Sequence, residues 1–220
     1  DFTGQDCSNC PTAHEVVASL KEQYGDAVVA VAVHATSVFG IPEGDPRGGL
    51  MLPDGNVYLS QWANPDNVSL PTGVVNRRGG LCDYSKWSTT VRDALAEDTQ
   101  VQLSIEADSV VGKDSIAIRV HLEPGVTVNA KLQLWVTENG IVARQRNGRQ
   151  TDRKYVHNHV YRGAVNGVGG EEVSLQKDMF LDFERGVQIK SEWNVENLSV
   201  VGFVYTEADG VLQAVECEVK

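Results

Sequence analysis

The hydrophobic pattern of the chain changes its period near residue 99, and this change constrains the fold more than any other feature. Before that point the clearest apolar pattern has helical spacing, and it runs from Ala13 to Tyr24. After it, apolar and polar residues alternate, as in the run from Val101 to Ala107. A period of two is typical of half-buried antiparallel strands. The sequence therefore predicts an α/β domain over residues 1–98 and an antiparallel β domain over residues 99–220.

The α/β domain contains one well-marked helix followed by one strongly apolar segment. The helix is expected to begin at Cys10-Pro11 and to end at Gly25, a residue that readily adopts the left-handed conformation past a helix end. The apolar run Ala27–Val33 follows. An uninterrupted run of this kind predicts a strand that is buried on both faces of a parallel sheet.

The rest of this domain is less regular. Residues 34–56 are rich in Gly and Pro and are expected to form a long surface excursion. A short helix is expected at Tyr58–Ala63, and a strand is expected at 70–77, entered through Pro71. A second helix should follow a cap at Asp83 or Ser85.

The β domain carries two dipeptides that favour tight hairpins. Asn139-Gly140 and Asp209-Gly210 each lie between apolar runs. We expect about seven strands and no helix in this domain, in an immunoglobulin-like β-sandwich.

Composition excludes some classes of protein. The chain has 220 residues and a formal net charge of −11, so it would repel nucleic acid. It contains no run of 18 apolar residues that could cross a membrane. Because it begins abruptly at Asp1, we expect that an upstream leader precedes it and that the protein is exported. No feature indicates an oligomeric state.

Four cysteines permit two disulfides in an oxidising compartment. Cys7 and Cys10 can bridge locally. Cys82 and Cys217 could pair only if their two regions meet in the fold. The alternative for this second pair is two separate buried thiols, which behave as small apolar side chains.

The first domain resembles the thioredoxin superfamily. Asp1-Phe2 precedes Cys7-Ser8-Asn9-Cys10 as in the family's active-site strand, and Leu70-Pro71-Thr72 is similar to its cis-proline strand. This resemblance implies that Pro71 faces the disulfide and holds a protein disulfide substrate, and that Asp1 accepts a proton from Cys10.

A second resemblance covers nearly the whole chain. It is carried by Phe2-Thr3-Gly4-Gln5, Cys7-Ser8-Asn9-Cys10-Pro11, Tyr24-Gly25-Asp26, Val33-His34-Ala35, Val75-Asn76-Arg77 and Val156-His157-Asn158-His159-Val160. These segments are similar to the outer membrane protein 28 family of Gram-negative anaerobes. The resemblance implies a thioredoxin-like domain followed by a β-sandwich. It also implies an exported protein of the periplasm or outer membrane, with association to the membrane through an N-terminal lipid anchor that is missing here. The family brings no firmly assigned activity.

Two functions remain open for the Cys-x-x-Cys motif. In thiol–disulfide exchange, Cys7 would be the exposed attacking thiolate and Cys10 the resolving thiol, helped by the helix N-terminus. Asp6 disfavours a thiolate at its neighbour. Pro11 suggests that Cys10 caps the helix, which would leave Cys7 outside it. The alternative is a non-catalytic envelope module whose disulfide is only structural.

Other polar residues are weaker candidates. Cys7, Cys10, His14 and His34 could bind zinc or copper, but we prefer a solvated His14 and a satisfied His34 at a strand end, so no metal and no cofactor is expected. A stripe along one strand face consists of Tyr155, His157, His159 and Tyr161. A basic cluster consists of Arg144, Arg146, Arg149, Arg153 and Lys154. We expect the stripe to be an ordinary polar face and the cluster to be a solvated hairpin.

Overall fold

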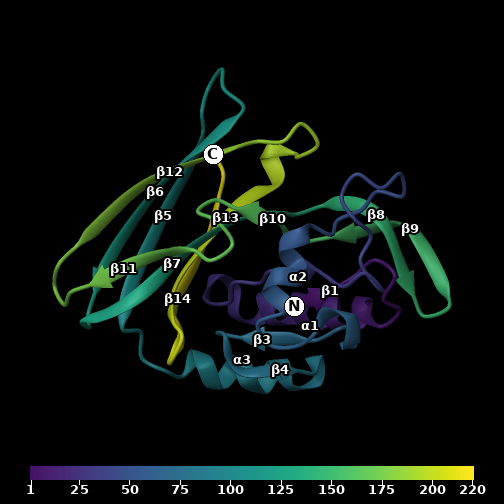
Figure 1. Cartoon of the computed structure of the whole chain (residues 1–220), viewed down its shortest axis with the longest axis horizontal. Helices are drawn as coiled ribbons and strands as arrows, with labels where there is room; N and C mark the ends of the chain where they lie inside the picture. Colours follow the sequence, from purple (N-terminus) through teal and green to yellow (C-terminus); the bar gives the residue numbers. More distant parts are fainter. The chain divides into compact units, whose positions relative to one another are not determined.

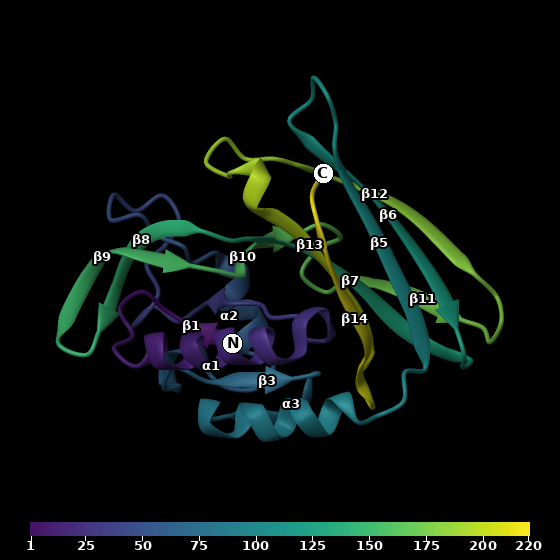
Figure 2. The ribbon, with the colours of Figure 1, turned by 180° about the vertical axis from the view of Figure 1, so that it is seen from behind.

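A computed structural model describes all residues, 1–220, and the chain forms two compact units. The first contains Asp1–Ala96 together with Asn139–Tyr161, and the second contains Glu97–Glu138 together with Arg162–Lys220. The structure is mostly β, with three α-helices and several antiparallel sheets (Figures 1 and 2). Sequence analysis grouped residues 139–161 with the β domain, whereas they fold with the first unit. We call this segment the inserted hairpin.

The first unit combines three helices with short strands. Its helices are α1 (Cys10–Tyr24), α2 (Pro53–Leu59) and α3 (Trp87–Leu95), and its strands are β1 (Phe2–Thr3), β2 (Val33–His34), β3 (Gly73–Val75), β4 (Arg78–Cys82), β8 (Ile141–Asn147) and β9 (Gln150–His157). Strands β1 and β2 are parallel, whereas β3–β4 and β8–β9 are antiparallel pairs.

Helix α1 confirms the prediction made from its apolar spacing. It ends at Gly25, whose φ of 55° and ψ of −131° form a conformation that is open to glycine but costly for a residue with a Cβ. Ala13 and Leu20 of α1 are buried against Trp87 at the start of α3. Asp83 caps the turn before α3 by accepting from the backbone of Ser85, which confirms the second helix and its cap.

Three local predictions in the first unit were wrong. The strand expected at Ala27–Val33 is reduced to β2, because β1 offers only two residues for pairing. The short helix begins at Pro53 rather than Tyr58, since proline fits the first turn of a helix. The strand expected at 70–77 is reduced to β3. The chain then turns through two residues with positive φ into β4, which the sequence did not predict.

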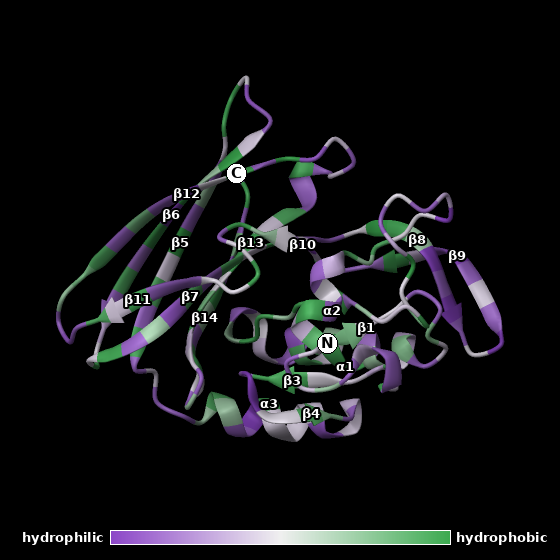
Figure 3. Ribbon diagram, viewed as in Figure 1, coloured by the Kyte–Doolittle hydropathy of each residue, from purple (hydrophilic) through white to green (hydrophobic).

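The second unit consists of antiparallel sheets that share one apolar core. Its strands are β5 (Val101–Ser109), β6 (Ser115–Pro124), β7 (Val128–Glu138), β10 (Val160–Ala164, which begins at the end of the inserted hairpin), β11 (Glu171–Leu175), β12 (Leu181–Gln188), β13 (Leu198–Thr206) and β14 (Gly210–Glu218). One sheet has the order β10-β7-β13-β14 with β11 also on β7, and the other has the order β12-β6-β5. Burial alternates along β5 as the sequence predicted, and its buried apolar side chains belong to the core. Figure 3 shows hydrophobic and hydrophilic stretches along the ribbons of these sheets.

Only one of the two hairpin dipeptides joins paired strands. Asp209-Gly210 connects β13 to β14, as predicted. Asn139-Gly140 does not connect paired strands, because β8 pairs with β9 rather than with β7. The Asn139 side chain instead accepts a hydrogen bond from the His159 backbone N–H at 2.8 Å, and the Asn158 side chain accepts one from Gly140 at 2.9 Å. These two bonds fasten the base of the inserted hairpin.

Cys82 and Cys217 are free thiols, so the second disulfide that the even cysteine count permitted is not formed. Each is partly exposed rather than fully buried. Among the helices, none combines the length and apolar character needed to cross a bilayer.

Candidate functional site

The candidate site is the Cys7–Cys10 disulfide, whose Cα atoms are 5.5 Å apart. Cys10 is the first residue of α1, and Asn9 rather than Cys10 occupies the cap position, which leaves Cys7 outside the helix. The exposed fraction is 1% for Cys7 and 0% for Cys10. The expectation of an exposed attacking sulfur at Cys7 is therefore wrong. We call residues 4–10, which carry the disulfide, the disulfide loop. Two segments of the first unit contact this loop: the inserted hairpin and residues 39–50.

The backbone of the inserted hairpin is hydrogen-bonded along the disulfide loop. The Arg146 N–H donates to the carbonyl of Gln5 at 2.8 Å, and the Gly148 N–H donates to the carbonyl of Ser8 at 2.9 Å. Strand β8 therefore pairs with β9 on one side and contacts the loop on the other. Figures 1 and 2 show β8 and β9 as a separate two-stranded ribbon.

Gln145 adds a side-chain contact directly at the cysteine. It is fully buried, and its Nε2 donates to the carbonyl of Cys7 at 2.9 Å and to that of Gly4 at 3.2 Å. Its closest partners are carbonyl oxygens, so the amide nitrogen is the atom that satisfies them. Gly4 in turn has no room for a side chain, because a Cβ there would lie 2.5 Å from the carbonyl oxygen of Phe39.

Gln5 joins the loop to both covering segments. Its Nε2 donates to the carbonyls of Gly48 at 2.9 Å and Arg144 at 3.2 Å, while its Oε1 accepts from the Leu50 N–H at 3.0 Å. Residues 39–50, part of the expected surface excursion, thus close the disulfide loop from another side. A buried glutamine with three such partners fixes three chain segments together.

Asp6, the residue before Cys7, is held by two guanidinium groups. Its carboxylate lies 2.7 Å from Arg144 and 3.8 Å from Arg47, and its N–H donates to Phe39. The charge that sequence analysis counted against a thiolate at Cys7 is therefore compensated by partners from both covering segments.

The two other predicted catalytic residues lie at the edge of the parallel pair. The buried Asp1 carboxylate lies 3.6 Å from His14 Nε2. The Leu70–Pro71 peptide bond is cis. Thr72, the next residue, pairs with Phe2 in β1 through a 2.7 Å hydrogen bond.

His14 is the centre of a partly buried polar network rather than a solvated helix residue. Its Nε2 is 2.9 Å from Thr3 Oγ1, and its Nδ1 is 2.8 Å from the Tyr155 hydroxyl. His157 packs edge-on against His14 and tilted against the buried His34, with ring centroids 6.4 and 5.5 Å away. Burial lowers the pKa of His14 to about 4, with a further contribution from His157, and burial lowers the pKa of His157 to about 4. Both imidazoles are therefore neutral at pH 7.

The stripe expected on one strand face is divided. Strand β9 ends at His157, and His159 has a φ of 57°. Tyr161 instead donates to Asp54 of α2 at 2.8 Å, and burial raises its pKa. No three His, Cys, Asp or Glu side chains in residues 1–220 are grouped to hold a metal ion.

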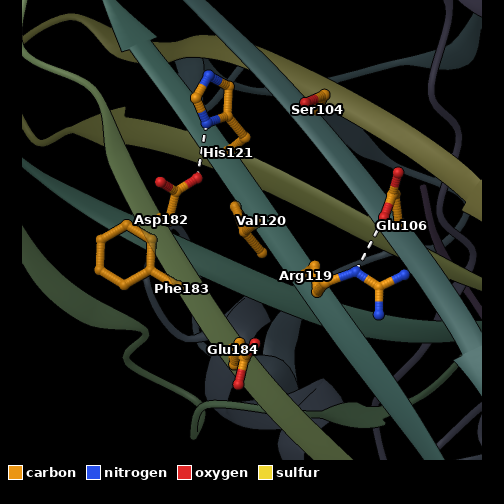
Figure 4. A pocket seen from close by; sticks show the side chains of 8 residues that line it. All are labelled: Ser104, Glu106, Arg119, Val120, His121, Asp182, Phe183 and Glu184. Carbon is orange, nitrogen blue, oxygen red and sulfur yellow. Dashed lines mark hydrogen bonds and ion pairs between the residues drawn. The ribbon is translucent and has the colours of Figure 1, made fainter.

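A second polar site lies on the β12-β6-β5 sheet of the other unit. A hollow of about 350 Å³ is lined there by Ser104, Glu106, Arg119, Val120, His121, Asp182, Phe183 and Glu184 (Figure 4). His121 Nδ1 is 2.7 Å from Asp182, a hydrogen bond that raises the pKa of His121, and Arg119 donates to Glu106 at 2.9 Å. These cross-strand pairs support the sheet, and nothing at the hollow indicates a ligand.

Sequence reasoning missed the two glutamines that close the site. Gln5 and Gln145 look like ordinary polar residues in sequence, and their contacts span up to 141 positions. The one available signal was the presence of Gln145 among basic residues in a strand, and that signal does not predict burial.

Comparison with known proteins places the chain in a family. The model of the outer membrane protein Omp28 family matches residues 58–220. No curated protein matches. Among solved structures, HBP35 of Porphyromonas gingivalis has a TM-score of 0.77 at 15% identity, covering 99% of this chain and 73% of its own. Protein AGR_C_4864 from Agrobacterium tumefaciens has a TM-score of 0.58 at 14% identity, covering 98% and 90%.

A domain of the outer membrane lipoprotein Omp28 from Porphyromonas gingivalis has 23% identity and a TM-score of 0.41, and covers 56% of this chain and 91% of its own. The two structures with higher scores share the fold, and at these identities they show no more than that. The family match covers well over half of the chain and confirms the predicted exported location at the periplasm or outer membrane of a Gram-negative bacterium. This chain belongs to the outer membrane protein Omp28 family.

Proposed function

We propose that this protein is a non-catalytic module of the cell envelope in which the Cys7–Cys10 disulfide is a structural cross-link. The observation that carries this proposal is the burial of both cysteines, in a loop to which the inserted hairpin is hydrogen-bonded. The cross-link fixes the carbonyl groups of the disulfide loop to which β8 and Gln145 are hydrogen-bonded.

The poor access of a thiolate to the two sulfur atoms explains why a structural role fits better than exchange. In exchange, a thiolate must approach a disulfide sulfur directly, so one sulfur of the pair has to be exposed. Here both cysteines are buried, and Gln145 and the β8 backbone are hydrogen-bonded to the loop that carries them, so exchange would first require this loop to open.

Thiol–disulfide exchange is the second candidate. It is supported by Cys10 at the start of α1 and by the order β1-α1-β2 with a parallel strand pair, which is compatible with a thioredoxin-like first unit. We also propose, as a separate point, that the β domain has an immunoglobulin-like fold. A dithiol would first reduce the pair. The Cys7 thiolate would then attack a substrate disulfide, and Cys10 would release the mixed disulfide, with Asp1 and Pro71 in the roles that the resemblance implies.

The reduction potential of the pair tests the first proposal. We expect a value below about −300 mV, the range of structural disulfides, from equilibration in dithiothreitol redox buffers. A value between about −270 and −120 mV would favour exchange instead. In a companion insulin-reduction assay, we expect the wild-type protein and Cys7→Ser to give the same background rate.

Replacing Gln145 by alanine should expose the disulfide. The Cys7 and Gly4 carbonyls would lose a buried donor, which typically costs about 1–3 kcal/mol of stability. We expect faster reduction by dithiothreitol, measured by thiol alkylation and mass spectrometry. Gln150→Ala is the matched control, because Gln150 is exposed in the same hairpin. Equal reduction rates in the two variants would show that the hairpin does not protect the sulfurs.

We also propose that a lipid anchor outside these 220 residues tethers the module to the outer membrane. The family name and the description of Porphyromonas gingivalis Omp28 as a lipoprotein support this proposal. Extraction of the full-length protein from membranes by detergent, but not by salt, is the expected result.

A further inference from the structure

The inserted hairpin concentrates positive charge on an acidic protein. The chain has 19 Lys and Arg against 30 Asp and Glu, yet residues 139–161 contain five basic side chains and a single acidic one, Asp152. The rest of the chain therefore carries 14 basic and 29 acidic side chains, so the segregation of charge onto one hairpin is sharp.

Most of these cations are available to a partner. Arg144 is engaged by Asp6, but Arg149, Arg153 and Lys154 are exposed and make no side-chain hydrogen bond or ion pair. Arg146 is exposed and donates only to the carbonyl of Gly148, at the turn of its own hairpin. Figure 3 shows the far end of the hairpin as mostly hydrophilic.

An exposed apolar pair lies on the same hairpin. Val142 and Val156 are directly opposite each other in the β8–β9 ladder, and their exposed fractions are 63% and 51%. Lys154 lies two residues before Val156 along β9. The hairpin also carries side chains that pack within the first unit, because Gln145 and His157 are buried there. These side chains are not available to a partner. Binding of a surface segment to a membrane increases with the apolar area that it buries and with the attraction of its Lys and Arg side chains to anionic lipid, and this hairpin offers both.

We propose that the inserted hairpin docks on an anionic lipid surface through Arg149, Arg153, Lys154 and the Val142–Val156 pair. This inference goes beyond the structural role proposed for the disulfide and does not depend on it. The family is one of outer membrane proteins, so a lipid surface is close at hand. A soluble polyanion would use the cations but would leave the valines in water, and this difference favours lipid.

The electrostatic attraction is local. A Lys or Arg close to an anionic membrane contributes about fivefold to binding, and the effect decays over a Debye length of about 8–10 Å. A hairpin in contact with lipid headgroups is within that range. Acidic side chains further from the surface are largely screened, so the net charge of −11 does not prevent docking.

Co-sedimentation with vesicles tests the proposal. The protein should bind vesicles of phosphatidylcholine mixed with phosphatidylglycerol and should bind pure phosphatidylcholine far more weakly. The triple variant Arg149→Gln/Arg153→Gln/Lys154→Gln should lower the partition coefficient about 100-fold. Lys86→Gln/Lys113→Gln/Lys177→Gln removes the same number of charges from exposed positions outside the hairpin and should change it less than about threefold.

The role of the apolar pair needs its own variant. Val142→Thr/Val156→Thr keeps the β-branched shape and should weaken vesicle binding without changing its salt dependence. Circular dichroism and the disulfide reduction potential should be unchanged in each hairpin variant. A failure of the docking proposal can therefore be distinguished from a failure of the structural-disulfide proposal.

Several outcomes would overturn the docking proposal. These are no binding to the mixed vesicles, equal binding to both kinds of vesicle, or equal losses in the two triple variants. Binding to inorganic polyphosphate without binding to vesicles would reassign the hairpin to a soluble polyanion and would also overturn it.

Discussion

Replacing Arg162 by methionine should lower the free energy of unfolding of the second unit by about 3–5 kcal/mol, a typical cost of breaking a buried ion pair. Arg162 and Glu138 are 5% and 4% exposed, and Arg162 Nε lies 3.2 Å from Glu138 Oε2. The substitution would leave the Glu138 carboxylate buried without its counter-ion. It would also remove the guanidinium that lies over the Trp193 ring, 5.7 Å from the ring centroid.

This ion pair joins the two residues that flank the inserted hairpin in the chain. Glu138 is the last residue of the second unit before the inserted hairpin, and Arg162 is the first residue after it. Glu138 also accepts a hydrogen bond from the Asn194 N–H at 2.9 Å. The pair therefore joins the two points at which the hairpin leaves the second unit and returns to it, while Asn139 and Asn158 fasten the base of the hairpin within the first unit.

Urea unfolding followed by tryptophan fluorescence measures the loss. Adding Glu138→Leu to Arg162→Met should recover much of it, because the unpaired buried charge is gone. Arg92→Met is the control, since Arg92 pairs with Asp93 at the surface and should change stability very little. A single variant as stable as the wild type, or a double variant no better than the single, would contradict this account.

The elements that the sequence predicted well are those set by local pattern. Helix α1 follows from apolar residues on one face and a glycine at its end, and β5 follows from strict alternation. The strand expected at Ala27–Val33 failed because its length depends on the partner, and β1 supplies only two residues. Hydrophobicity predicts burial, but it does not predict how much neighbouring backbone is available for pairing.

The candidate functional site was harder to predict from the sequence than these elements. Spacing alone predicted that Cys7 and Cys10 can bridge, and they do. The loop that carries them is hydrogen-bonded to Gln145, which is 138 positions away from Cys7, and His14 is hydrogen-bonded to Tyr155 at a separation of 141. Contacts between such distant residues leave no periodic signal in a single sequence, so neither the cover over the disulfide nor the neutral histidines could be anticipated.

Lowering the pH from about 7 to about 4.5 should destabilise the first unit by about 3 kcal/mol. The pKa values of His14 and His157 fall from 6.5 to about 4 on folding, mainly because of burial. In this window the unfolded chain binds protons at both residues and the folded chain does not. The contribution of these histidines therefore leaves stability unchanged above about pH 6.5 and lowers it progressively as the pH falls toward 4.

The neighbours of the two imidazoles limit the size of the effect. The Asp1 carboxylate, 3.6 Å from His14, would partly stabilise an imidazolium there. His157 works in the opposite direction, because two protonated rings so close together repel each other. Tyr155 stays neutral, since burial and the nearby Glu15 and Asp152 raise its pKa. Because Asp1 favours protonation of His14 in the folded chain, we expect less than the roughly 5 kcal/mol that two independent histidines would give.

The structural consequence follows from where these residues lie. Tyr155 and His157 belong to β9 of the inserted hairpin. Thr3, His14 and His34 belong to β1, α1 and β2. Charging the network should therefore loosen the inserted hairpin first. Dithiothreitol reacts poorly at low pH, so a phosphine reductant should be used, and it should reduce Cys7–Cys10 faster at pH 4.5 than at pH 7.

Urea unfolding across this pH range, with NMR titration of the histidine ring protons, measures both parts of the prediction. His121 is an internal reference, because its exposed ring is hydrogen-bonded to Asp182 and should titrate above 6.5. His157→Phe keeps an aromatic ring in the network and should flatten much of the acid slope, whereas His121→Gln should leave the slope between pH 6.5 and 4.5 unchanged. If His14 and His157 titrate near 6.5 and stability is constant over that range, the network is open to solvent and the hairpin does not seal the disulfide.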